Sequence, residues 1–191
     1  MSLFSIVARE SFISIVLDCD EFQSYGDQNQ QEMTIFREIT PNQSFYIFTG
    51  QIEYGEEAWE LAKTLSVQGL KLIDIANTIH GYLNKKDRPF AKMEAVIGGV
   101  SENGQIQYHI ITDDEEVQSH YPKIGESLYY ANDLSYRLNP MEELARKLMM
   151  KGMSSVTQAQ TAQLALFRKF TGARGGTNSV AQCMVVEKQP H

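Results

Sequence analysis

Cysteine is scarce in this 191-residue chain, and neither cysteine nor histidine is spaced as in a metal site. The two cysteines, Cys19 and Cys183, provide no disulfide framework, and we expect both to be free, buried thiols. The four histidines are isolated from one another along the chain. The sequence therefore predicts neither a bound metal nor a cofactor.

Strongly basic segments and long apolar runs are also missing. The 17 basic residues are scattered beside acids in a chain of net charge −7, so no basic field could hold a nucleic-acid backbone. The longest apolar stretch is far below the ~20 residues that cross a bilayer. Charged residues at Arg9, Glu10 and Asp18 interrupt the N-terminal apolar segment, which argues against a secretory signal. We expect a cytoplasmic protein that binds neither nucleic acid nor membrane.

The composition is that of a globular protein with a substantial core. Apolar residues make up 42% of the chain and charged residues 21%. The length fits one domain, and we predict a single domain over residues 1–191.

The hydrophobic pattern changes period along the chain, which separates strands from helices. Runs rich in β-branched and aromatic residues predict strands over residues 3–8, 12–17, 33–39, 44–50, 92–101, 104–112, 126–132 and 179–188. Helical spacing predicts helices over 54–69 and 70–86, a third opened by Asn139 and Pro140, and a fourth capped by Ser154 and ending near Phe170. Strands and helices that occur in separate groups indicate antiparallel sheets with layered helices, not a doubly wound parallel sheet.

Three segments carry a resemblance to a known family. They are "YIFTGQIEYGEEAWELAKTL" (46–65), "EAVIGGVSENGQIQYHIIT" (94–112) and "GARGGTNSVAQCMVVEK" (172–188). In this order and spacing the chain resembles the proteasome β-subunits and HslV, which belong to the N-terminal-nucleophile (Ntn) hydrolase superfamily. The resemblance implies an α+β fold, a four-layer αββα sandwich of two antiparallel sheets between helix layers. It also implies self-association, because the family builds rings.

The resemblance further implies a set of site residues. Ser2 aligns with the family's nucleophile once Met1 is removed; its hydroxyl would attack an amide carbonyl while its own α-amine takes the proton. Asp18 aligns with the neighbouring acid, and Gly50 with the glycine whose N–H holds the oxyanion. Ser135 is the possible substitute for the serine that assists the α-amine.

At other positions of the family's site, this chain has different residue types. The family's lysine aligns with Met33 or Thr34 of this chain, and the first 60 residues contain no lysine. The second acid falls at Thr171. Arg9 and Arg37 are the cations of that N-terminal stretch, and neither is expected to lie at the lysine position. Without a cation, an acid beside the α-amine stabilises its ammonium form and weakens it as a base.

Three functions remain open on these residues. The favoured interpretation is a proteasome β/HslV-like protein with a degenerate active site that serves assembly or binding as a homo-oligomer, either a ring or a dimer. The alternative is a peptide or amide hydrolase that uses Ser2. A third possibility is a module that binds a peptide or a small metabolite.

Overall fold

The computed structural model describes residues 3–18, 32–84, 93–112, 115–132, 139–172 and 181–188. The chain divides into two compact units. One unit is formed by residues 28–121 with the last residues of the chain, and the other by residues 2–27 with residues 122–185.

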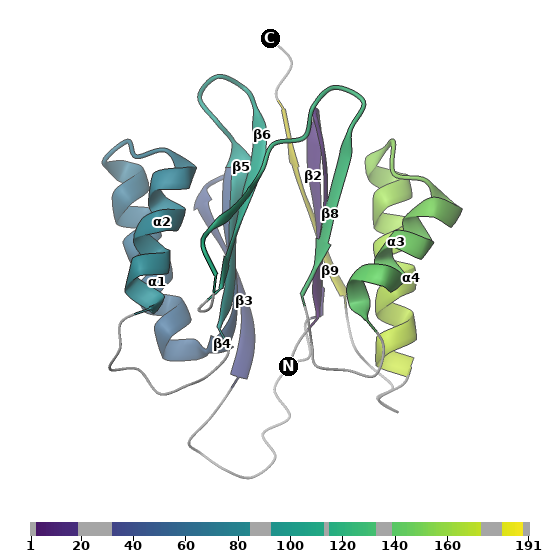
Figure 1. Ribbon diagram of the computed structural model, residues 1–191, viewed down its shortest axis with the longest axis horizontal. Coiled ribbons are helices and arrows are strands. Elements are labelled where there is room, and N and C mark those ends of the chain that lie inside the picture. The colour runs from purple at the N-terminus through teal and green to yellow at the C-terminus, as the bar shows by residue number, and fades with distance from the viewer. Residues whose placement is uncertain are drawn as a thin grey trace. The chain divides into compact units, whose positions relative to one another are not determined.

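The unit of residues 28–121 is a five-stranded antiparallel sheet with two helices on one face (Figure 1). The strands lie in the order β3 (Glu32–Thr40), β4 (Ser44–Gln51), β5 (Glu94–Val100), β6 (Ile106–Thr112) and β7 (Gln118–His120). The helices are α1 (Ile52–Val67) and α2 (Leu72–Leu83). Alternate residues of the strands pack against them in one apolar core, because successive side chains of a strand point to opposite faces.

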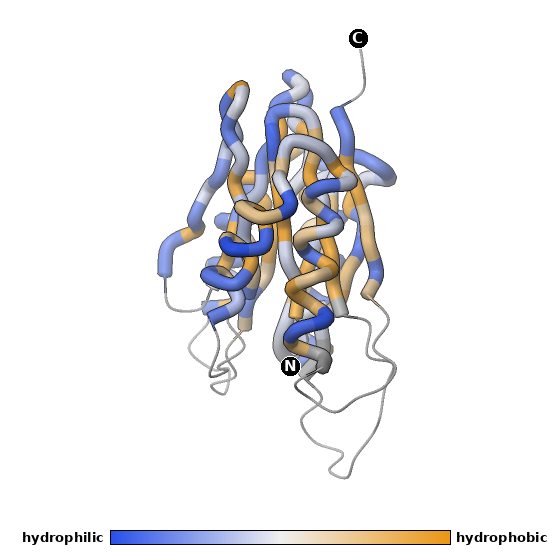
Figure 2. The backbone as a smooth tube through the Cα atoms, turned by 90° about the vertical axis from the view of Figure 1, so that its right-hand side faces the viewer, coloured by the Kyte–Doolittle hydropathy of each residue, from blue (hydrophilic) through white to orange (hydrophobic). Residues whose placement is uncertain are grey.

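The second unit has a four-stranded sheet with its own pair of helices. Its strands lie in the order β8 (Ser127–Ala131), β1 (Phe4–Arg9), β2 (Phe12–Asp18) and β9 (Ala181–Glu187). The helices α3 (Pro140–Lys151) and α4 (Val156–Gly172) pack on the face that carries Leu3, Val7, Phe12 and Val16. Figure 2 shows these helices alternating hydrophobic and hydrophilic residues, as expected for helices with one packed face.

The two helix starts in this unit follow local capping chemistry. The Asn139 side chain accepts hydrogen bonds from the N–H groups of Met141 and Glu142, and Pro140 occupies the first helical turn, as predicted. The prediction that Ser154 caps α4 is wrong. Ser155 directly precedes the helix, and its Oγ accepts a hydrogen bond from the N–H of Gln158.

The structure differs from the sequence interpretation at two further points. The short strand β7 was not predicted, because "QSH" is polar and shows no apolar alternation. The prediction of a buried thiol is wrong for Cys183, which is free but exposed on β9 at the edge of its sheet. Cys19 lies outside the described residues.

Candidate functional site

Strand pairing places Asp18 and the beginning of β1 at the same end of the β1–β2 hairpin. The hairpin pairs Phe4 with Leu17, so the residues before Phe4 and the residue after Leu17 share that end. Asp18 is the last residue of β2. Ser2 lies outside the described residues, as does Ser135, and the side chain of Asp18 is not described. Their proposed roles stay predictions.

Asn132 completes the hydrogen bonding at the beginning of β1. The backbone pairing of β1 with β8 begins at Ser5 opposite Ala131. One residue further, the Phe4 N–H donates to the Asn132 side-chain Oδ1 at 2.7 Å, and the Asn132 N–H donates to the Phe4 carbonyl at 3.3 Å. Asn132 is 1% exposed. A side-chain amide therefore continues the ladder where the chain leaves β8.

Gln163, on the helix α4 that covers one face of this sheet, binds the next residue of β1. Its Nε2 donates to the carbonyl and hydroxyl oxygens of Ser5, at 3.0 and 3.1 Å, and to the Ser14 carbonyl at 3.3 Å. Its Oε1 accepts from the Ser14 hydroxyl at 2.6 Å. All three residues are fully buried, so these bonds form in an apolar layer where an unpaired polar group is costly.

Sequence interpretation missed Asn132 and Gln163, although Gln163 left a signal. Gln163 lies in the apolar stripe of its helix, four residues after Ala159 and three before Leu166. Ser5 and Ser14 occupy positions of β1 and β2 that otherwise carry apolar side chains toward the helices. Polar residues in an apolar stripe indicate a buried hydrogen-bonded partner.

Gly50, the predicted oxyanion glycine, lies near the end of β4 in the unit of residues 28–121. Its φ is +146°, a conformation that favours glycine. It is buried, and an added Cβ would come within 2.9 Å of the Phe48 ring and 3.1 Å of Met93 Cγ. Backbone conformation and space both select glycine here, whether or not its N–H binds an oxyanion.

Met33 and Thr34, the two positions at which the sequence resemblance predicts the loss of a lysine, pair with residues at the end of β4. Met33 pairs with Gly50 across β3 and β4, and Thr34 pairs with Thr49. The hydroxyls of the two threonines lie 3.1 Å apart and share a hydrogen bond. This pair of strands therefore carries a neutral hydroxyl pair beside Gly50.

Each of the two N-terminal arginines pairs with an acid of its own unit. Arg37 lies four residues along β3 from Met33, about 13 Å at the rise of a strand. Its Nη2 pairs with Glu56 on α1 at 2.5 Å, and its guanidinium lies 5.7 Å from the centre of the Trp59 ring. Arg9 lies at the other end of β1 from Phe4 and pairs with its neighbour Glu10 at 3.3 Å. The sequence interpretation of these two arginines agrees with their positions.

A buried histidine on β6 holds the edge strand β7. His109 is fully buried, its Nδ1 lies 2.9 Å from the Ser119 hydroxyl, and its Nε2 lies 3.1 Å from the Gln107 Oε1. Burial, with a smaller contribution from His120, lowers the pKa of His109 to about 4. A base this weak is poorly matched to proton transfer near pH 7, so we interpret this group as structural.

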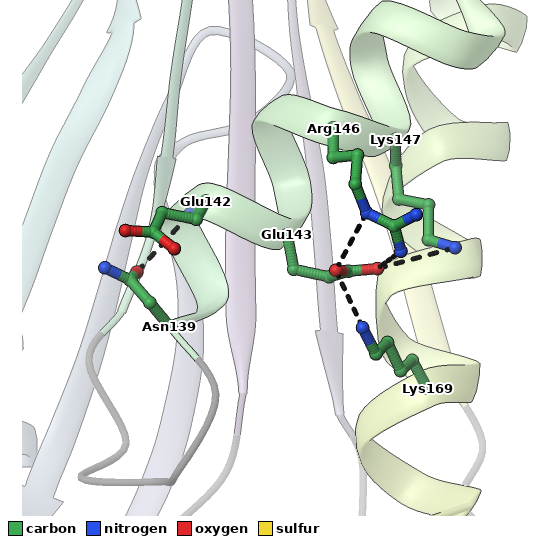
Figure 3. Close-up of polar contacts among 6 residues, drawn as sticks. All are labelled: Asn139, Glu142, Glu143, Arg146, Lys147 and Lys169. Atoms are coloured by element: carbon green, nitrogen blue, oxygen red, sulfur yellow. Dashed lines mark hydrogen bonds and ion pairs between the residues drawn. The ribbon is translucent and has the colours of Figure 1, made fainter.

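A charged cluster joins α3 to α4 (Figure 3). Glu143 has a side chain 9% exposed and receives three cations: Arg146 at 2.5 Å, Lys169 at 2.8 Å and Lys147 at 3.5 Å. Burial by itself raises the pKa of the Glu143 carboxyl. The hydrogen bonds and charges of Arg146 and Lys169 outweigh burial and lower this pKa to about 2.

Replacing Glu143 with Gln is expected to remove part of the acid sensitivity of folding. Because the pKa of Glu143 is lowered from 4.5 to about 2, its ionised form stabilises the fold above pH 4.5, and this stability is lost as the pH falls toward 2. We expect Glu143→Gln to lower the free energy of unfolding by about 2 kcal/mol at pH 7 and by much less at pH 3. Urea unfolding at both pH values measures this difference.

Glu142 provides the matched control. It is the neighbouring residue, is exposed, and contributes its backbone N–H to the Asn139 cap. Glu142→Gln is expected to change stability by less than about 0.5 kcal/mol at either pH. Equal losses for the two variants would contradict the interpretation.

Comparison with known proteins identifies a solved structure with a similar fold. No protein-family model matches the chain, and no curated protein sequence matches it. Among solved structures the chain is similar to Anbu (ancestral beta-subunit) from Yersinia bercovieri, with a TM-score of 0.69. The fold is proteasome-like. The similarity covers 97% of this chain and 81% of that chain at 8% identity, and it confirms the predicted α+β class with two antiparallel sheets and helix layers.

The similarity concerns the fold alone, because residue roles do not transfer at 8% identity. The predicted single domain stays a prediction, as do the four site residues. In the part of the chain that the structure describes, no helix is long and apolar enough to cross a membrane. No group of three or more histidines, cysteines or acids placed for a metal ion occurs in that same part.

Proposed function

We propose that this chain is a proteasome β-like protein whose N-terminal site lacks the family's catalytic arrangement and which serves assembly or binding in the cytoplasm. The observation that carries the proposal is the neutral Thr34–Thr49 hydroxyl pair next to the pairing of Met33 with Gly50. The nearest cation along β3, Arg37, is already paired with Glu56. An Asp18 carboxylate without a compensating cation would hold the α-amine in its ammonium form, which cannot accept a proton.

The partner that we propose is a second copy of this chain, in a dimer or a ring. The resemblance to ring-forming proteins supports self-association, and the proteasome-like fold is the scaffold that such assemblies use. A peptide or small-molecule ligand is compatible with the same scaffold.

Native mass spectrometry and light scattering of the untagged protein test the assembly proposal. We expect a single closed oligomer whose mass is an integer multiple of the chain at micromolar concentration. A chain that stays monomeric at 100 μM would contradict assembly with copies of itself.

A second candidate function, hydrolysis of a peptide or amide bond by Ser2, is favoured by what the site retains. Two observations support this candidate: Asp18 follows Leu17, which pairs with Phe4 at the beginning of β1, and Gly50 has a conformation that selects glycine. In this reaction the Ser2 hydroxyl oxygen attacks the carbonyl carbon while its proton moves to the α-amine. The carbon–nitrogen bond then breaks, and the leaving amine takes that proton. Water next attacks the ester carbonyl carbon and gives a proton to the α-amine; the bond to the Ser2 oxygen breaks, that oxygen takes the proton, and the acid product leaves.

A β-lactone probe separates the two candidates. Ser2 would open the lactone ring: its oxygen bonds to the carbonyl carbon, the ring carbon–oxygen bond breaks, and the released alkoxide takes the proton from the ammonium. Intact mass would then show loss of Met1 and gain of one probe, and Ser2→Ala would gain none. A chain that retains Met1, or that loses it and gains no probe, contradicts hydrolysis by Ser2 and leaves the assembly proposal standing.

A further inference from the structure

The helix pairs of the two units carry opposite net charge. With His80 neutral, α1 and α2 contain five acids and one base, a net charge of −4. In contrast, α3 and α4 contain five bases and two acids, a net charge of +3. Each pair packs on one face of its own sheet, and its other side faces away from that sheet (Figure 1). We call the outward side of α1 and α2 the acidic helix surface and that of α3 and α4 the basic helix surface.

Helix stability explains only part of this charge distribution. Acids near the beginning of a helix and bases near its end interact favourably with the helix dipole. Among its described residues, α1 has no base in its last turn, and α4 has no acid in its first turn. Each of these helices therefore carries one sign of charge where its own dipole would favour both.

Ion pairs within the second unit leave the positive charge of the basic helix surface in excess. The Glu143 carboxylate is surrounded by three cations, so this cluster retains two positive charges (Figure 3). Lys151 and Arg168 add two more, because both are exposed and neither forms an ion pair with a residue that the structure describes. The surface therefore has charge available for a partner.

The acidic helix surface likewise has unpaired charge. Glu56 pairs with Arg37 of β3 and is neutralised within its own unit. Glu53 and Glu60 are exposed, and within the described part of the chain no cation pairs with either. Asp74 of α2 is also exposed. This surface complements the basic one in sign and in approximate magnitude.

Both surfaces also carry exposed apolar side chains. Of the five large apolar side chains exposed in the described part of the chain, three lie on these helices: Val67 at 85%, Met149 at 83% and Met150 at 65%. Val67 follows Glu60 by seven residues and Glu53 by fourteen, which places all three on one face of α1. Apolar side chains beside charged ones are typical of protein interfaces, where the apolar part excludes water and the charges select the partner.

We propose that copies of this chain associate by docking the acidic helix surface of one copy on the basic helix surface of the next. This inference rests on the proposed assembly of the chain with itself and names the surfaces that meet. Opposite charges steer the two surfaces together, and flexible methionine side chains adapt to the facing copy. Because the contact joins two different surfaces, each copy can bind two neighbours, as a ring requires.

Two charge-reversal variants of the full-length protein test the inference. The first, Glu53→Lys with Glu60→Lys, disables the acidic helix surface. The second, Lys151→Glu with Arg168→Glu, disables the basic helix surface. Native mass spectrometry and light scattering at micromolar concentration measure association. We expect each variant alone to associate about 100-fold more weakly than the wild type, because like charges then face each other across the contact.

An equimolar mixture of the two variants is expected to recover one contact. The first variant keeps the basic helix surface and the second keeps the acidic one, so the two should bind in one-to-one complexes. The wild-type net charge of −7 changes by four units in each variant, to −3 in the first and −11 in the second. Since both remain negative, a general attraction between oppositely charged proteins does not explain their pairing.

The matched controls make the same changes of charge at exposed residues outside the helices. Glu102→Lys with Glu116→Lys matches the first variant, and Lys123→Glu with Lys188→Glu matches the second. We expect both controls to keep the wild-type assembly mass. If the second variant does not fold, Met149→Glu replaces it, and we expect the same weakened association and the same pairing with the first variant.

The outcomes distinguish failure of this inference from failure of the proposed assembly. A wild-type chain that stays monomeric at 100 μM overturns the assembly, and the inference falls with it. If the wild type assembles and the two variants keep its mass, the contact lies elsewhere, so the inference is overturned and the assembly stands. Two monomeric variants that do not pair when mixed also overturn the inference, as do controls that dissociate as much as the variants.

Discussion

Replacing Gly99 with Ala is expected to abolish stable folding of this protein. Gly99 lies on β5, between Ser44 of β4 and Gln107 of β6, with φ at +154°. An added Cβ would lie 2.2 Å from the Gln43 carbonyl oxygen and 2.7 Å from Ser44 Cα. Both are backbone atoms, so no rotation of a flexible side chain relieves the overlap.

The turn before β4 cannot move aside without further loss. The Gln43 carbonyl that blocks the Cβ also accepts the N–H of Val100, at 2.9 Å. Moving it breaks this bond and disturbs the β4–β5 pairing at the middle of a five-stranded sheet. Backbone strain of about 1–3 kcal/mol and overpacking of similar size add to this loss, so we expect a total above about 4 kcal/mol.

Gly81 offers a control of opposite sign. It lies within α2, is exposed, and an added Cβ would meet no atom within 4 Å. Gly81→Ala is expected to stabilise the protein by about 0.5–1 kcal/mol, because alanine loses less backbone entropy in a helix. Urea unfolding compares the two variants. A Gly99→Ala protein with a wild-type unfolding midpoint would contradict the predicted overlap.

Replacing Gln163 with Met is expected to destabilise the unit of residues 2–27 and 122–185 by about 3 kcal/mol. Methionine has nearly the same length and leaves little cavity, but it offers neither the Oε1 acceptor to Ser14 nor the Nε2 donor to Ser5. The Ser14 hydroxyl is then buried without its partner, in a core of leucine, valine and phenylalanine side chains. The cost is mainly the unmade hydrogen bonds.

The triple variant Ser5→Ala, Ser14→Ala and Gln163→Met tests that explanation. Removing the unsatisfied hydroxyls together with the amide is expected to recover most of the lost stability, since apolar groups replace all three side chains. Gln160→Met, a partly buried glutamine of the same helix, is the control and should change stability by less than about 0.5 kcal/mol. A triple variant no more stable than Gln163→Met would show that packing, and not hydrogen bonding, causes the loss.

Much of the architecture could be read from local patterns. The strand at residues 44–50 is a continuous apolar run that ends in glycine, and it forms β4 within one residue of the predicted end. The helix that begins at Pro140 is specified by its own cap, since the Asn139 side chain bonds two N–H groups of the first turn. Such signals act over a few residues, and chain order then restricts how strands can pair.

Local patterns failed where a tertiary contact defines the element. The strand β7 has three polar residues, and contacts to β6 hold it: the His109–Ser119 hydrogen bond and the stacking of His120 on Tyr108 at 4.6 Å. No periodicity within "QSH" encodes these contacts. The start of α4 was misplaced for a related reason, because consecutive serines are equivalent until the helix selects which hydroxyl meets the N–H of Gln158.

The sequence by itself determined the class of fold and the order of the elements other than β7, because each depends on residue type at a known place in the chain. Tertiary structure alone decided the contacts within each unit: that the Thr34 and Thr49 hydroxyls share a hydrogen bond, that Glu56 pairs with Arg37, and that Asn132 and Gln163 bind β1. The physical reason is sequence separation. Asn132 is 128 positions from Phe4, and Gln163 is 158 positions from Ser5. The hydrogen bonds between these residues form only after the sheet and helices have packed, so no local pattern specifies them.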